Sequence, residues 1–126
     1  MKHAEVAARI LLAVVFIAAG ISGFLIVNNP PQMPPGLAMS FQTIFFQSRW
    51  VLYVDGLELV AGAPLLVNRC VPLALTVLAG IIYNMLVFHI TMMPIGLPAP
   101  LLLLILLLVV ANRHRAAFLP LFAAKA

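Results

Sequence analysis

Charged side chains are scarce in this chain: Asp, Glu, Lys and Arg together make up 8% of its 126 residues. Soluble domains carry about 25% charged residues and roughly 45–50% apolar ones, whereas 65% of the residues here are hydrophobic. This composition excludes a soluble domain of any size and predicts a polytopic membrane protein in contact with the lipid bilayer. The net charge of +4 rests on only seven Lys and Arg residues, which flank the apolar runs, so no nucleic-acid partner is expected.

Cysteine is almost absent, because Cys70 is the only one. A single thiol excludes an internal disulfide, a CxxC redox pair and a cysteine-based zinc site. A haem held inside a helix bundle usually needs paired axial ligands, and His89 is the only histidine within the apolar runs. We therefore expect no intrinsic cofactor and no resident metal, and we do not expect the chain to be an enzyme on its own.

Four apolar runs dominate the sequence, at approximately 6–27, 51–67, 71–92 and 98–111. A helix rises about 1.5 Å per residue, so runs of roughly 20 residues can cross the hydrocarbon core of a bilayer. Proline-containing or polar segments separate the runs, and proline does not continue a helix. The sequence predicts an all-α fold, a bundle of four transmembrane helices that forms a single domain over residues 1–126.

The first loop, residues 28–50, has two parts. A proline-rich stretch comes first, and then Leu37, Phe41, Ile44 and Phe45 recur at helical spacing. This second part is too short to span a membrane, so we expect a short amphipathic helix that lies in the interface.

The basic residues indicate the orientation. In a four-span arrangement six of the seven fall on one side, and Arg49 alone falls on the other. The six are Lys2, Arg9, Arg69, Arg113, Arg115 and Lys125. Basic residues concentrate on the cytoplasmic side, so both termini are expected in the cytoplasm of a bacterial cell, with a multi-pass chain in its cytoplasmic membrane.

Asp55 and Glu58, two of only three acidic residues, lie within the second apolar run. A charged group near the bilayer centre costs at least ~2.5–3.5 kcal/mol and usually marks a functional site. Asp55, Glu58 and Gly62 are spaced i, i+3 and i+7, so they share one helix face. We expect this face to point into the bundle.

Counting about 1.5 Å per residue places several polar or small residues in one outer-leaflet layer. The predicted ligand-binding or proton-exchanging residues are Asp55, Glu58, Asn84 and His89, and the predicted packing or pocket-wall residues are Gly20, Ser22, Gly23 and Gly62. Simpler roles stay open: the acids and Asn84 can form structural hydrogen bonds between helices, and His89 can be a solvated side chain. His89 with Met92 and Met93 also offers imidazole and thioether ligands for copper, but these are too few to assign a metal site.

Several segments together resemble the DoxX-like family of membrane proteins. They are residues 8–12 (ARILL), Gly20-x-x-Gly23-Phe24, residues 56–62 (GLELVAG), residues 68–75 (NRCVPLAL), Asn84-x-x-x-Phe88-His89 and Pro94-x-Gly96-Leu97-Pro98. The similarity covers nearly the whole chain and implies a four-helix membrane protein associated with membrane redox processes. Glu58, Asn84 and His89 match positions of the family pattern, whereas Asp55 does not belong to it, and Ser22 and Gly23 stand where many members have a lysine.

Three functions follow from these observations. The first is binding of a quinone or another amphipathic molecule in the outer-leaflet half, in support of a redox enzyme, with the acid pair as hydrogen-bonding or proton-exchanging groups. The second is a non-catalytic assembly subunit of a larger respiratory complex, or a homo-oligomer. The third is a small proton-coupled carrier, for which no inverted repeat is present.

Overall fold

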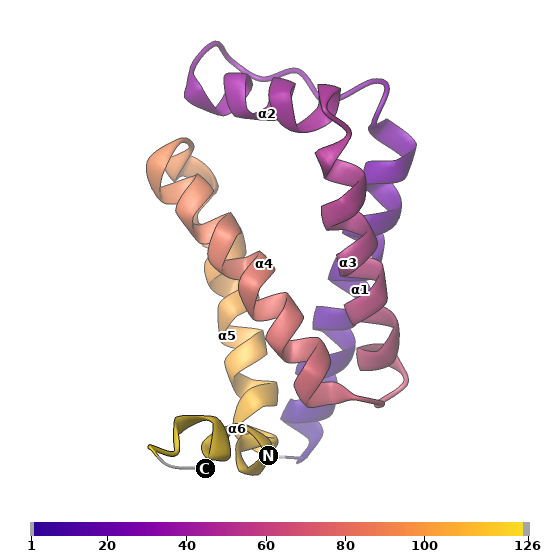
Figure 1. Ribbon diagram of the computed structural model, residues 1–126, viewed down its shortest axis with the longest axis vertical. Coiled ribbons are helices and arrows are strands. Elements are labelled where there is room, and N and C mark those ends of the chain that lie inside the picture. Colours follow the sequence, from indigo (N-terminus) through magenta and orange to yellow (C-terminus); the bar gives the residue numbers. More distant parts are fainter. Residues whose placement is uncertain (1, 125–126) are drawn as a thin grey trace.

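The computed structural model describes residues 2–124 and, over that range, contains only helices (Figure 1). Six α-helices and two 3₁₀ turns follow one another as α1 (Lys2–Ile26), α2 (Leu37–Gln47), α3 (Trp50–Leu66), α4 (Val71–Thr91), η1 (Pro94–Gly96), α5 (Pro98–Arg113), α6 (Arg115–Phe118) and η2 (Leu119–Phe122). The prediction of an all-α chain is confirmed, and a short helix, α2, occupies the second part of the first loop.

Three segments are long and apolar enough to cross a membrane: α1, α4, and η1 together with α5 over Pro94–Arg113. The remaining long helix, α3, has 17 residues, which corresponds to a rise of about 26 Å. The structure therefore supports a multi-pass membrane protein with three candidate spans, while a fourth span at α3 stays a prediction.

Figure 1 shows α1 and α3 side by side, whereas α4 and α5 form a second pair that leans away from them toward the end where α2 lies. Both chain ends lie at the opposite end. We call the part of the bundle next to α2 the α2 half and the part next to the chain ends the termini half. Arg49 lies at the α2 end, and Lys2, Arg9, Arg69, Arg113 and Arg115 lie in the termini half; Lys125 is outside the described residues.

The apolar core is concentrated in the termini half. Leu12 and Phe16 of α1 and Leu78 of α4 are at most 1% exposed. The same cluster includes Ala8, Ala13, Ala61, Leu65, Val71, Ala74, Leu75, Ile81, Ile82, Leu103, Leu107 and Val110. No residue of α4 after Ile82 is buried, so the helices form a closed four-helix core only near the chain ends.

Candidate functional site

Asp55 and Glu58 lie on the face of α3 that packs against α1. Each is only 7% exposed, and Val51, Gly62 and Leu65 are buried on the same helix. These positions repeat every three or four residues, which is the spacing of one helix face. The two acids therefore point into the protein, as the sequence predicts, and the helix they face is α1.

Glycines on α1 make room for this contact. The carboxyl group of Asp55 occupies the space that a Cβ on Gly23 would need. A Cβ on Gly20 would lie 2.8 Å from the backbone oxygen of Asp55, and one on Gly62 would lie 2.8 Å from Cγ1 of Ile17. All three glycines thus lie in the contact between α1 and α3, which we call the α1–α3 seam. Ser22, in contrast, is exposed.

The two carboxyl groups come from positions i and i+3 on the buried face of α3. One oxygen of each group, Oδ2 of Asp55 and Oε2 of Glu58, is buried and has no hydrogen-bond partner among the described residues. Buried polar atoms are nearly always hydrogen-bonded in proteins, so two orphaned oxygens in one place call for an explanation.

Asn84 and His89 lie elsewhere. Nδ2 of Asn84 donates to the carbonyl of Gly80 on its own helix at 2.9 Å, and the side chain is exposed. Nδ1 of His89 lies 2.7 Å from the carbonyl of Met85, also on α4, and the edge of the ring lies against Gly96. The structure therefore brings Asp55 and Glu58 together, but no hydrogen bond among residues 2–124 links Asn84 or His89 to them.

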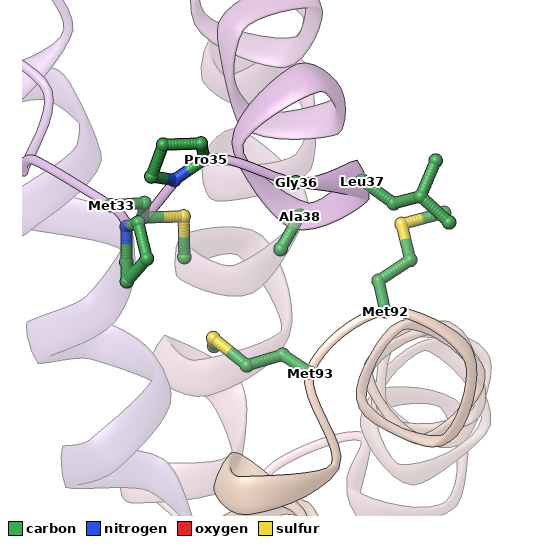
Figure 2. Close-up of a pocket in the computed structure, with 8 residues that line it drawn as sticks. Met33, Pro35, Gly36, Leu37, Ala38, Met92 and Met93 are labelled. Atoms are coloured by element: carbon green, nitrogen blue, oxygen red, sulfur yellow. The ribbon is translucent and has the colours of Figure 1, made fainter.

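Two cavities that are open to the surface lie near the α2 end, and neither is lined by the acid pair. One, of about 230 Å³, is lined by Ser48, Trp50 and Tyr53. The other, of about 140 Å³, lies between the proline-rich loop and the end of α4 (Figure 2).

A second buried polar cluster was not predicted from the sequence. Glu5 and Arg9 of α1 are 8% and 7% exposed, and Oε1 of Glu5 lies 3.7 Å from Nε of Arg9. Nη1 of Arg9 donates to the carbonyls of Leu65 at 2.6 Å and Leu66 at 3.2 Å. Arg9 thus satisfies carbonyl groups in the last turn of α3, which have no partner within the helix. In the sequence, the i, i+4 spacing of Glu5 and Arg9 is compatible with an ion pair on one helix face. A basic residue near the end of a span also indicates orientation, so the sequence alone does not show that Arg9 is buried.

Within residues 2–124, no three His, Cys, Asp or Glu side chains come together as a possible metal site. Comparisons of the chain with protein-family models, with curated proteins and with solved structures find no match. The resemblance to the DoxX-like family therefore stays a prediction, and the site has to be interpreted from its own geometry.

Proposed function

We propose that the chain is a four-span membrane protein of the DoxX-like type, with both termini in the cytoplasm of a bacterial cell. The course of the chain supports α3 as the fourth span. Because α3 runs back along α1, α4 starts at the same end of the bundle as α1 (Figure 1). The basic side chains of the termini half support the proposal that this half faces the cytoplasm and that the α2 half lies in the outer leaflet.

We further propose that the outer-leaflet half binds a quinone or a similar amphipathic molecule at the acid pair. The observation that carries this proposal is the pair of buried, unpartnered oxygens, Oδ2 of Asp55 and Oε2 of Glu58. Leaving a buried acceptor unsatisfied costs about 1–3 kcal/mol. A ligand that brings a hydroxyl group to these oxygens recovers that free energy.

Two neighbouring acids on one helix face can share one proton, and such a pair suits both forms of a quinone. The protonated carboxyl donates a hydrogen bond to a quinone carbonyl, and the ionised one accepts a hydrogen bond from a quinol hydroxyl. The pair can then pass one proton to or from the ligand, while electrons are exchanged with a partner redox complex. The role proposed for this chain is binding and proton exchange, not electron transfer.

A second candidate function is that of a scaffold subunit in a larger complex or a homo-oligomer. The observation that favours it is the direct contact between the Asp55 carboxyl and Gly23, which fixes how α1 and α3 fit together. In this case the acid pair stabilises the seam and binds nothing.

Binding of a water-soluble, short-tailed quinone to the protein in lipid nanodiscs distinguishes the two functions. Trp50 is the only tryptophan and begins the helix that carries the acids, so a bound quinone should quench its fluorescence. We expect saturable quenching in the wild type and at least a tenfold loss of affinity in Glu58→Gln.

Asn84→Ala serves as the control, because its exposed side chain bonds only to its own helix. Binding in this variant should equal that of the wild type. If quenching never saturates in the wild type, or if Glu58→Gln binds the quinone equally well while its unfolding temperature changes, the scaffold function is correct instead.

A further inference from the structure

The chain continues beyond its last candidate span. That span covers Pro94–Arg113, and α6 and η2 follow it over Arg115–Phe122. Figure 1 shows these two elements turning sideways from the end of α5, at the end of the bundle where α1 begins. We call Arg115–Phe122 the C-terminal segment. It starts two residues after the span, which is the level of the lipid headgroups if α5 crosses the membrane.

The C-terminal segment is apolar, yet most of its large side chains are not covered by the protein. Phe118 packs against the apolar core, whereas Leu119, Leu121 and Phe122 are 63%, 74% and 84% exposed. Apolar surface is driven out of water in proportion to its area. A segment with exposed apolar side chains at the end of a span meets this requirement by lying in the membrane interface, where those side chains reach the acyl chains of the lipid.

The charge next to these apolar side chains is of one sign. Arg113 and Arg115 lie on either side of the junction between α5 and α6, and both are exposed. Glu5 is the only acidic residue of the chain outside α3, and it forms an ion pair with Arg9. No acidic side chain in the termini half is therefore left to neutralise the two arginines.

This combination identifies what covers the C-terminal segment. The planar guanidinium group matches the oxygens of a phosphate, and basic clusters beside a span attract anionic lipid headgroups. A second copy of the chain does not fit, because it would bring the same positive charge to the contact. A soluble acidic partner would neutralise the arginines but would not cover the apolar side chains. An anionic phospholipid does both.

We propose that the C-terminal segment binds an anionic phospholipid in the leaflet next to the chain ends. Arg113 and Arg115 donate hydrogen bonds to the phosphate oxygens of the headgroup, and Leu119, Leu121 and Phe122 contact the acyl chains. This proposal requires that α5 crosses the membrane. It does not depend on the acid pair, on a quinone or on the side of the membrane that the chain ends face.

The test is native mass spectrometry of the full-length protein in detergent micelles, titrated with dioleoyl phosphatidylglycerol or with dioleoyl phosphatidylcholine. We expect phosphatidylglycerol to bind at least tenfold more tightly. A basic residue near an anionic surface contributes about fivefold in affinity, so R113Q/R115Q should lose at least tenfold toward phosphatidylglycerol and little toward phosphatidylcholine. Glycerol phosphate, which has no acyl chains, should not displace the bound lipid.

The matched control is R49Q/R69Q, which also removes two exposed positive charges but leaves the C-terminal segment unchanged. This variant should keep the preference of the wild type. A second variant, L121S/F122S, removes the apolar contacts and should weaken the binding of both lipids at least threefold.

Four outcomes would overturn the proposal. They are equal affinity of the wild type for the two lipids, equal losses in R113Q/R115Q and R49Q/R69Q, displacement of the lipid by glycerol phosphate, and a dimer of the wild type that L121S/F122S dissociates. In the last case a second copy of the chain, and not a lipid, covers the C-terminal segment.

Discussion

The two halves of the bundle are stabilised in different ways. In the termini half, all four long helices contribute to one apolar cluster that includes Leu12, Leu65, Leu78 and Val110. In the α2 half, α4 buries no residue after Ile82, and the close contact is between α1 and α3 at the glycines and the acid pair. The termini half is a packed core, and the α2 half is a pair of two-helix arms bridged by a short helix.

This difference assigns the main source of stability to the termini half and the proposed binding site to the α2 half. Between membrane helices the hydrophobic effect is weak, because lipid is as apolar as a leucine side chain, so close packing and polar contacts determine association. Both halves contain buried polar atoms without a hydrogen-bond partner: Oε1 of Glu5 and Nε of Arg9 in the termini half, and Oδ2 of Asp55 and Oε2 of Glu58 in the α2 half. In the termini half the two atoms form an ion pair 3.7 Å long, whereas both atoms in the α2 half belong to acids. The α2 half, where the two cavities described above also lie, is therefore the half that we propose receives a ligand.

The largest effect on stability is expected from replacing Arg9, whose side chain joins α1 to α3 in the termini half. Arg9→Gln leaves Glu5 buried without its ion pair and removes the hydrogen bonds to the carbonyls of Leu65 and Leu66. Removing one partner of a buried pair costs about 3–5 kcal/mol. We expect that loss in the free energy of unfolding, measured by denaturant titration in mixed micelles.

The control for this change is Arg69→Gln. Arg69 is exposed at the same end of the bundle, and its removal should change the free energy of unfolding little, because exposed charges contribute about 0–1 kcal/mol. Equal losses in the two variants would mean that the total positive charge, and not the Arg9 contact, stabilises the termini half.

A smaller effect is expected at the seam of the α2 half. A Cβ on Gly20 would lie 2.8 Å from the backbone oxygen of Asp55, so Gly20→Ala pushes α1 and α3 apart. Overpacking of this kind costs about 1–3 kcal/mol. The same denaturant titration should show this loss, and cysteine cross-linking should show weaker contact between α1 and α3.

Gly56→Ala is the matched control, because a Cβ at Gly56 meets nothing within 4 Å. Removing a glycine from a helix interior gains about 0.5–1 kcal/mol, so this variant should be as stable as the wild type or more stable. A loss of stability in Gly56→Ala equal to that in Gly20→Ala would show that the seam has no special role.

The helices could be predicted from the sequence because their signals are local. The apolar runs and the prolines place the expected runs at 6–27 and 71–92 close to α1 at Lys2–Ile26 and α4 at Val71–Thr91. The turn between α3 and α4 likewise follows from a short polar segment, where Asn68 and Cys70 adopt positive φ angles. The course of the chain and the lengths of the helices can therefore be predicted without knowledge of tertiary contacts.

The candidate site could be predicted only in part, because depth in the membrane does not fix the rotation of a helix. Asp55 and Asn84 were placed in the same layer by counting residues, yet the Asn84 side chain is exposed and bonds to its own helix. On a membrane helix the lipid-facing side is as apolar as the core-facing side. The pattern of apolar residues therefore does not show which side of α4 faces the other helices. It also does not show that the second half of α4, after Ile82, contributes no buried residue.

The smallest expected effect concerns the bridge that closes the α2 half. No residue of α2 is buried, and the ring of Phe41 lies 5.2 Å from that of Phe88 on α4, which contributes about 0.5–1.5 kcal/mol. Phe41→Leu should let α2 leave α4, so spin labels at positions 43 and 91, in a Cys70→Ser background, should give a broader distance distribution with little change in stability. Phe46→Leu is the control, since Phe46 contacts Phe45 within α2. If Phe46→Leu broadens the distribution equally, the packing within α2, and not its contact with α4, keeps the two arms of the α2 half bridged.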